Sequence, residues 1–496
     1  MRARAALAFV ILTMVAGIVA CAGGSFGSLP NGALPPRLQD ATGTNGRIKH
    51  VVIVIQENRS FDNFFATFPG ADGTRTGKAA AMPRSIAQSC NQPIEEPTTI
   101  PLKEVDLAPT PGPAPTWQDL DHLYGGFQID RDHGQMDGFD LSYYGASGQG
   151  GPTCRYTYQY VNPAQIAPYW DMAKQYVLAD HTFQTQGSGS FTSHQELIAG
   201  GTQIASNEAL IDNPSYFPWG CDARTPNPTA SPKIPGVVTA IIKRGGKVYE
   251  YGGPFPCLHY KTLRDLLDAK SVSWRYYAVA VQKWTGQQHG DTAGIWSAFD
   301  AIKAVRYSPE WNARVTRSPL EIFKDISAKR LPAVSWVTSD GANSDHPGEF
   351  SKTGQPVDTG PSWVASIVNA IGQSSYWNST AIVVVWDDWG GYYDHVPPPE
   401  PRNWQGGPGF RVPMLIVSPY VKPHVEHTIY EFGSILKFIE SIWNLGSLGN
   451  NDEHSTSIGT AFDFGMPPRK FKKIPAKYSR DFFLHQQPSG IAPDTE

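Results

Sequence analysis

Two runs of apolar residues limit the folds open to this chain. Residues 51–55 read VVIVI and residues 381–385 read AIVVV, with no polar residue in either run. Such runs suit strands buried on both faces of a parallel sheet, because a half-exposed strand would alternate apolar and polar residues. Apolar residues at helical spacing predict helices at 295–305, 362–371 and 431–443. We therefore expect an α/β fold, with a central, mostly parallel sheet flanked by helices.

Polar residues follow both apolar runs directly. Glu57 and Asn58 come after the first run, and Asp387 and Asp388 come after the second. Open α/β sheets bind ligands beyond the carboxyl ends of their strands, and adjacent carboxylates in a low-dielectric cleft repel each other unless a cation or proton lies between them. We expect a divalent metal there, with magnesium, calcium or manganese suiting oxygen ligands and iron or zinc as alternatives. In a plainer alternative, Glu57 caps the next helix, Asn58 closes a turn and one aspartate is solvated.

A loop of small residues at 187–190 leads into an expected helix that carries His194. At the start of a helix, a serine hydroxyl is surrounded by backbone N–H groups and the positive end of the helix dipole, which favour an anion. Ser190 is therefore a candidate nucleophile toward phosphate. The alternative role for Ser190 is that of an N-cap, which serines fill very often.

Three histidines lie in polar segments outside the expected strands and helices. His122 follows Asp121, His346 follows Asp345 beyond a β-rich run, and His289 lies in a polar loop. A histidine beside carboxylates binds a metal, protonates a leaving group or holds a loop in place. The residues alone leave these three roles open.

The first twenty residues predict a targeting segment. Arg2 and Arg4 precede an apolar stretch at 5–20, and the sequence IVAC at 18–21 resembles the lipobox of bacterial lipoproteins. This resemblance implies cleavage before Cys21 and a lipid anchor on it, whereas ordinary signal peptide cleavage near Ala20 is the alternative. In either case we expect an exported protein, anchored in a bacterial membrane and facing the periplasm or the cell exterior, or secreted.

The cysteine count agrees with export. Of the five cysteines, four remain after Cys21, an even number for an oxidising compartment. Three connectivities are possible, and we expect Cys90 to pair with Cys154 and Cys221 with Cys257, because each pair closes a local loop. The net charge of −4 gives no reason to expect a nucleic-acid partner, which a basic stripe would favour.

Four segments, in the same order, resemble the bacterial phosphoesterase family that contains phospholipases C and an acid phosphatase branch, on the alkaline-phosphatase-like fold. They read ENRSFDNFF (57–65), GSGSFTSHQELIAG (187–200), WDDWGGYYDHVPPP (386–399) and RVPMLIVSPYVKP (411–423). The likeness runs from about residue 48 to residue 439. The residues that it implies as metal ligands are Glu57, Asn58, Ser190, Asp387 and Asp388.

The resemblance also implies catalytic roles. Ser190 occupies the nucleophile position, where phospholipase-type members usually carry threonine and phosphatase-like members serine. His122, His289 and His346 are implied to contact the phosphoryl group. The family commonly has Gly-Pro before the nucleophile and a proline after it. Here Ser188-Gly189 and Thr192 stand at those positions, so Ser188 and Thr192 are rival hydroxyls.

These observations predict a metal-dependent phosphoric ester hydrolase that forms a phosphoserine intermediate. It would act on a phosphate ester or a phospholipid, as a phosphatase or a phospholipase C. A glycoside hydrolase with paired carboxylates and a non-catalytic surface lipoprotein on the same fold are the alternatives. The predicted organisation is a signal peptide (1–20), a flexible tether (21–46), one catalytic domain with long disulfide-pinned loop insertions (47–485) and a tail (486–496).

Overall fold

The computed structural model describes residues 46–92, 97–107, 119–145, 148–214, 220–221, 238–245, 247–279, 295–347, 356, 358–400 and 407–487. The predicted signal peptide, Cys21, His289, nearly all of the predicted tether and the tail from residue 488 lie outside these ranges. The expectations that concern them therefore stay predictions. Among the described residues, no helix combines the length and the apolar character that crossing a membrane requires.

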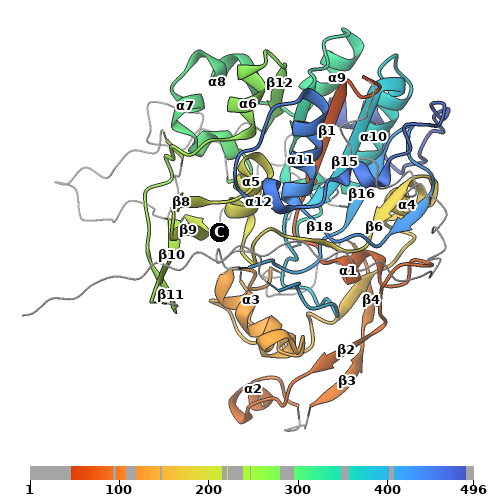
Figure 1. Cartoon of the computed structure of the whole chain (residues 1–496). Helices are drawn as coiled ribbons and strands as arrows, with labels where there is room; N and C mark the ends of the chain where they lie inside the picture. Colours follow the sequence, from red (N-terminus) through yellow and green to blue (C-terminus); the bar gives the residue numbers. More distant parts are fainter. Residues whose placement is uncertain are drawn as a thin grey trace, which may run out of the picture.

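An eight-stranded sheet forms the centre of the fold (Figure 1). All pairings between neighbouring strands are parallel except those of β16, which runs antiparallel to both β15 and β6. The predicted central, mostly parallel sheet is thus confirmed. In sheet order the strands are β13 (Val315–Thr316), β12 (Trp274–Tyr277), β14 (Val334–Val337), β1 (His50–Gln56), β15 (Thr380–Trp386), β16 (Met414–Val417), β6 (Val177–Ala179) and β17 (His424–Glu426).

The two apolar runs form the neighbouring strands β1 and β15 in the middle of the sheet. β1 pairs in parallel with β14 on one side and with β15 on the other. Every residue of the runs at 51–55 and 381–385 is fully buried, because helices cover both faces of this part of the sheet. Burial on both faces explains why neither run alternates with polar residues.

Two hydrogen bonds show that helices lie on opposite faces of the sheet. Trp336 of β14 donates from Nε1 to the carbonyl of Leu197 in α5 (Ser190–Ala199), and Trp336 pairs in register with Ile53. Gln56 lies three residues beyond Ile53, hence on the other face, and donates to the hydroxyl of Tyr169 in α4 (Ala167–Gln175). Helix α11 (Phe432–Trp443) packs on α5, and α10 (Gly360–Gly372) packs on α4 and α9 (Glu321–Ser327).

One predicted helix is wrong. Residues 295–305 form a 3₁₀ turn at Ala298–Ala301 and the separate short helix α7 (Lys303–Arg306). Ile302 between them is extended, with φ −103° and ψ 105°, and forms a bridge with Leu258. That tertiary contact overrides the helical pattern of the sequence.

Several of the remaining elements form excursions from the central sheet (Figure 1). Their strands are β2 (Thr76–Ala79), β3 (Thr98–Pro101), β4 (Lys103–Val105), β5 (Gln159–Val161), β8 (Gln203–Ala205), β9 (Glu208–Pro214), β10 (Val238–Arg244) and β11 (Lys247–Gly252). Their helices are α2 (Arg84–Ser89) and α3 (Tyr124–Arg131). One excursion carries a four-stranded antiparallel sheet. Another carries the antiparallel pair β2 and β3, with α2 between the two strands, and then the parallel pair β4 and β5. Helices α6 (Leu263–Ala269) and α8 (Pro309–Arg314) instead precede β12 and β13 of the central sheet, and α8 packs on both of these strands.

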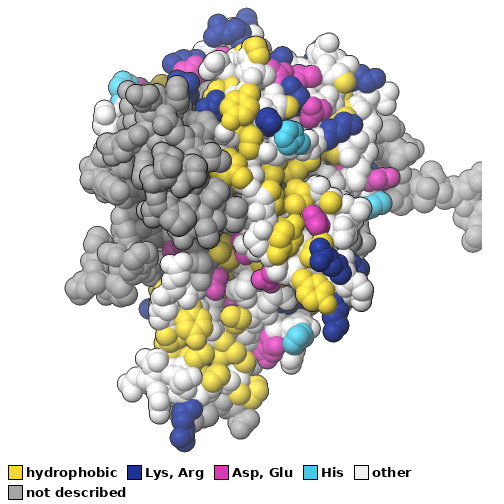
Figure 2. Space-filling model, turned by 90° about the vertical axis from the view of Figure 1, so that its left-hand side faces the viewer, with side chains coloured by type: hydrophobic (Ala, Val, Ile, Leu, Met, Phe, Trp, Pro, Cys, Tyr) yellow, Lys and Arg dark blue, Asp and Glu magenta, His cyan; other side chains and the backbone are white. Residues whose placement is uncertain are grey.

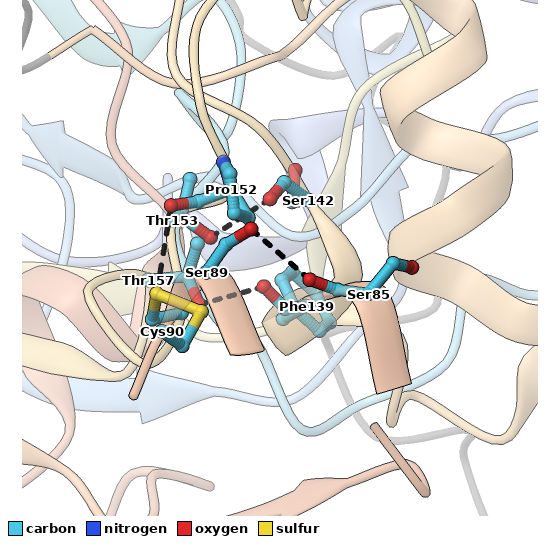
Figure 3. Close-up of a disulfide and its surroundings, with 9 residues drawn as sticks. Ser85, Ser89, Cys90, Phe139, Ser142, Pro152, Thr153 and Thr157 are labelled. Carbon is cyan, nitrogen blue, oxygen red and sulfur yellow. Dashed lines mark hydrogen bonds between the residues drawn. A yellow bond between two sulfur atoms is a disulfide. The ribbon is translucent and has the colours of Figure 1, made fainter. Parts of the chain in front are cut away.

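Both predicted disulfides are present. Cys90 bonds to Cys154, and Cys221 bonds to Cys257. The first disulfide joins the end of α2 to the segment before β5, in surroundings where side-chain hydroxyls such as that of Thr157 bond to backbone carbonyls (Figure 3). The disulfides therefore pin the loop insertions, as expected.

Charged side chains of both signs lie on the face of the molecule that Figure 2 shows. On the face shown in Figure 2, lysines and arginines alternate with aspartates and glutamates and do not gather into one basic patch.

Candidate functional site

The turn after β1 places Glu57 and Asn58 at the carboxyl edge of the sheet. Asn58 adopts the left-handed region with φ 55°, a conformation that asparagine tolerates better than most residues. Gly390 (φ 62°) packs so closely against this turn that a Cβ there would lie 2.3 Å from the Asn58 carbonyl oxygen. The next helix, α1 (Phe61–Phe65), takes Ser60 as its N-cap. The alternative in which Glu57 caps that helix is therefore wrong.

The strand β15 delivers Asp387 and Asp388 to the same edge. The Asp387 backbone N–H donates to the Gln56 carbonyl over 2.9 Å, which continues the parallel register of β1 and β15. Oδ1 of Asp387 accepts hydrogen bonds from the Asn58 N–H at 2.9 Å and from the Asp388 N–H at 2.7 Å. Both aspartates are fully buried, which excludes the alternative of a solvated aspartate.

Helix α5 brings Ser190 to the two aspartates. Gly189 is the N-cap and Ser190 is the first helical residue, so the alternative in which Ser190 itself caps the helix is wrong. Its hydroxyl instead donates to Oδ2 of Asp388 over 3.2 Å. Because α5 begins here, the positive end of its dipole faces the carboxylates.

The two rival hydroxyls are engaged with each other. Thr192 Oγ1 donates to Ser188 Oγ over 2.8 Å, and that oxygen also accepts the backbone N–H of Asp212 at 2.7 Å. Neither contact involves the aspartates after β15. Of the three hydroxyl residues in this loop, Ser190 is therefore the one placed to react beside Asp388.

His194 joins the site from the next turn of α5. Its Nε2 lies 3.1 Å from Oε1 of Glu57 and 3.8 Å from Oδ2 of Asp387. Burial lowers the pKa of His194 to about 4, against the opposite pull of the Asp387 charge, so its imidazole is neutral near pH 7. The predicted ligand set does not include His194, although its position four residues after Ser190, on the same helix face, is a signal in the sequence.

The contacts of the two ring nitrogens of His194 are compatible with a cation between His194 and Glu57. The Tyr276 hydroxyl donates to the Trp296 carbonyl, so toward Nδ1 of His194, 3.5 Å away, it acts as an acceptor. Neutral His194 then holds its proton on Nδ1 and presents the Nε2 lone pair to the Glu57 carboxylate. Two acceptors that face each other at hydrogen-bond distance are compatible only with a proton or a cation between them, so this group of side chains can hold a cation.

The buried oxygens also fit a metal ion. Asn58 Oδ1 and Asp387 Oδ2 are buried and have no hydrogen-bond partner among the described residues, which is costly unless they coordinate an ion. One ligand atom from each of Glu57, His194 and Asp387 lies within 4.8 Å of the others. The donor set is mostly oxygen with one nitrogen, and it suits a divalent cation.

A second group of polar residues lies beside the first. His122 Nδ1 is 2.7 Å from the Leu120 carbonyl and so carries the proton, which leaves Nε2 to accept from Asn58 Nδ2 at 3.2 Å. This contact orients the Asn58 amide so that Oδ1 is the atom left for the cation. The rings of His122 and His346 have centroids 6.3 Å apart, so the structure brings these two predicted residues together. Asp119 completes the group and is absent from the predicted site.

A salt-bridge cluster braces the loop after β15. Arg411, which is fully buried, donates from Nε to Asp394 Oδ1 over 2.8 Å. His395 Nδ1 lies 2.6 Å from Asp62 Oδ2; burial opposes protonation of His395, but the hydrogen bond and charge of Asp62 outweigh it and raise its pKa. The guanidinium and the imidazolium compensate the carboxylates of this cluster, so it needs no metal ion.

Comparisons with known proteins match this chain to one family model and to several curated relatives. Residues 48–446 match the family model described as the Phosphoesterase family. Phospholipase C B of Mycobacterium tuberculosis is 26% identical over 470 residues, which cover 86% of this chain and 79% of that protein. Non-hemolytic phospholipase C of Pseudomonas aeruginosa is 22% identical over 484 residues, covering 89% and 61%. Non-specific phospholipase C3 of Arabidopsis thaliana is 24% identical over 449 residues, covering 85% and 74%.

A solved structure with a similar fold is a protein in the alkaline phosphatase superfamily from Vibrio parahaemolyticus. It is 12% identical, with a TM-score of 0.30, over 58% of this chain and 63% of that chain. A similarity of this size carries no conclusion about the site.

Proposed function

The chain belongs to the phosphoesterase family, and from this premise we propose that it is a metal-dependent phosphoric ester hydrolase with Ser190 as its nucleophile. The observation that carries the proposal is the contact between Ser190 and Asp388. The hydroxyl lies at the start of a buried helix, 3.2 Å from a carboxylate of the donor set. The proposed nucleophile Ser190 thus lies beside a cluster of metal-type ligands and at the positive end of a helix dipole.

The residues that would hold the metal are Glu57, Asn58, Asp387 and Asp388, with His194 and the Ser190 oxygen beside them. When bound, the ion would lower the pKa of the Ser190 hydroxyl and offset negative charge on the phosphoryl oxygens. The oxygen donors of the proposed metal site follow both β1 and β15, so the site can form only because these two strands are neighbours in the sheet.

The chemistry then follows from the side chains. Ser190 Oγ passes its proton to Asp388 Oδ2, to which it already donates, and attacks phosphorus. The bond from Oγ to phosphorus forms, and the bond from phosphorus to the leaving oxygen breaks. The leaving alkoxide takes a proton from a neighbouring histidine. The acid that we propose is His346, whose ring lies beside that of His122 with the two centroids 6.3 Å apart. Water then attacks the phosphoserine and gives one proton back to the histidine. The bond from Oγ to phosphorus breaks, Ser190 recovers its proton from Asp388, and phosphate or the phosphorylated head group leaves.

Two substrate classes fit this scheme. The relatives described above are named phospholipases C, and a phospholipid would be cleaved between its glycerol oxygen and phosphorus. A serine rather than a threonine at the nucleophile position is, by the family resemblance, the mark of the phosphatase-like branch. We propose a phospholipase C or phosphatase, with the phosphoryl group as the shared recognition element.

The decisive experiment uses the purified chain with p-nitrophenyl phosphate and with phosphatidylcholine vesicles. We expect hydrolysis of one or both, a loss of at least about 100-fold after chelation, and recovery when a single divalent metal is restored. Release of nitrophenol identifies the phosphatase, and release of phosphocholine identifies the phospholipase C. Failure to cleave either ester with any of magnesium, calcium, manganese, iron or zinc would overturn the proposal.

We also propose that the protein is exported and carries a lipid on Cys21. The argument is the IVAC sequence after an apolar stretch with two arginines before it. Growth of an expressing bacterium with radiolabelled palmitate would label the wild-type chain but not Cys21→Ser. Equal labelling of the two chains would exclude the anchor.

A further inference from the structure

A second group of metal-type ligands lies at the same edge of the sheet, after strands of which the nearer is separated from β15 only by β16. Asp180 and His181 directly follow β6, and His427 directly follows β17. β6 and β17 pair in parallel, with Ala179 opposite Glu426. The residues that follow these two strands therefore come to lie side by side.

Two imidazoles converge on one buried carboxylate. Asp180 is fully buried, and its Oδ1 lies 2.9 Å from Nδ1 of His181. Nδ1 of His427 lies 2.9 Å from Oδ2 of Asp180 and 3.0 Å from Oδ1. One ligand atom from each of the three residues lies within 4.8 Å of the others.

The second ring nitrogen of His181 has the partner that a metal-binding histidine usually has. Its Nε2 lies 3.3 Å from Oδ2 of Asp72, and a carboxylate in this position holds the proton on Nε2 and turns the Nδ1 lone pair inward. In that tautomer Nδ1 and the Asp180 oxygen are both acceptors, and either a second proton on His181 or a cation between the two atoms removes the conflict. The salt-bridge cluster around Arg411 adjoins this group, because Arg411 donates from Nη1 to the backbone carbonyls of Asp72 and Asp180. Its guanidinium pairs with the Asp394 carboxylate, however, and not with that of Asp180.

The group is open to solvent on one side. The side chain of His427 is 60% exposed and that of His181 is 21% exposed, whereas that of Asp180 is inaccessible. An ion can thus enter from solvent and keep water in its remaining coordination positions.

We propose that Asp180, His181 and His427 form a second divalent-metal site, of the zinc type, with Asp72 orienting His181. Two nitrogen ligands and one carboxylate favour zinc, copper or nickel over magnesium and calcium. The site differs in this preference from the oxygen-rich cluster beside Ser190. Bound metal would join the ends of β6 and β17 and stabilise the folded chain, because ligands so far apart in sequence converge only after folding.

The test separates this site from the one beside Ser190. The parent is the full chain carrying Asp387→Asn and Asp388→Asn, which disables the first site, and the probe is zinc alone, followed by calorimetric titration. We expect the parent to bind one zinc ion. Adding His427→Ala or His181→Ala should weaken that binding by about 10-fold to 100-fold. His485→Ala is the matched control, because it removes an exposed histidine paired with a single aspartate, and it should leave binding unchanged.

A thermal measurement distinguishes a metal site from a salt bridge. In the same parent, zinc should raise the melting temperature, and His427→Ala should abolish this rise while changing the melting temperature little in chelator. The proposal is overturned if the parent binds no zinc, if the alanine variants bind it as tightly as the parent, or if zinc raises their melting temperature equally. None of these readouts depends on catalysis, so they are independent of the proposed function.

Discussion

The Ser190 hydroxyl oxygen lies 3.2 Å from Oδ2 of Asp388, although the two residues are 198 positions apart in the sequence. Each is fixed by a buried element, Ser190 by the start of α5 and Asp388 by the end of β15. Rigid elements hold a reactive group more accurately than loops do. The contact therefore makes specific predictions for variants of the residues around it.

Ser190→Ala should abolish the first chemical step. With its nucleophile removed, the enzyme should lose activity on p-nitrophenyl phosphate by at least about 10³-fold, while its melting temperature changes little. Ser193→Ala is the matched control, since Ser193 lies on the same helix and its hydroxyl accepts a hydrogen bond from Gln184. Full activity in Ser190→Ala, or an equal loss in Ser193→Ala, would rule out Ser190 as the nucleophile.

Asp387→Asn should weaken binding of the catalytic metal. The substitution removes a charge from the donor set and should raise the metal dissociation constant by roughly 10-fold to 100-fold, measured by the metal concentration that restores half of the activity. Asp463→Asn is the control, because Asp463 forms a surface ion pair with Lys422. An unchanged metal requirement in Asp387→Asn would argue against this residue as a ligand.

His346→Ala should slow the hydrolysis of phosphate esters with poor leaving groups most. If His346 donates the proton, its loss should cost roughly 10²-fold in kcat on an alkyl phosphate but much less on p-nitrophenyl phosphate, whose phenolate departs without a proton. His122→Ala should instead raise the metal requirement, because His122 orients Asn58. Equal losses on both esters in His346→Ala would show that His346 is not the general acid.

Glu440→Gln should change how stability depends on pH. Burial, together with the charge of Asp452, raises the pKa of Glu440 from 4.5 to about 8, so between these values the folded chain holds a proton that the unfolded chain has lost. The contribution of Glu440 to stability is thus present below pH 4.5 and is lost as the pH rises toward 8. Glu440→Gln should be more stable than wild type at pH 8, on the order of 2 kcal/mol, because a pKa difference of one corresponds to about 1.4 kcal/mol.

Urea unfolding at pH 5 and pH 8 measures this effect. The two chains should differ little at pH 5, and Glu453→Gln, which changes an exposed glutamate at a nearby position, should behave as wild type at both values. A stability difference that is the same at pH 5 and pH 8 would contradict the assignment.

The sequence was most informative where a local pattern decides the structure. Unbroken apolar runs predict β1 and β15, and polar residues just after them predict Glu57, Asn58, Asp387 and Asp388 at the sheet edge. A loop of small residues before a helical pattern predicts the start of α5 at Ser190. These features depend on burial and on backbone conformation within a few residues.

The sequence was silent where strand order decides the structure. His194 faces Glu57 only because α5 crosses the end of β1, and Asp180 meets His427 only because β6 and β17 are neighbours. The antiparallel direction of β16 is likewise a property of the assembled sheet. No local pattern carries such pairings between distant segments, and for the same reason the bridge at Ile302 ended the helix predicted at 295–305.

The pairing of β1 with β15 also has a consequence for biosynthesis. A growing chain that ends at α10 already contains Glu57 and Ser190, but it has neither Asp387 nor Asp388. Such a chain cannot complete the proposed metal site, because contacts between segments so far apart in the sequence form only after both segments have been made. A nascent chain that ends before residue 387 therefore lacks two of the four proposed oxygen-bearing ligand residues, and the proposed metal site can form only after most of the chain has been made.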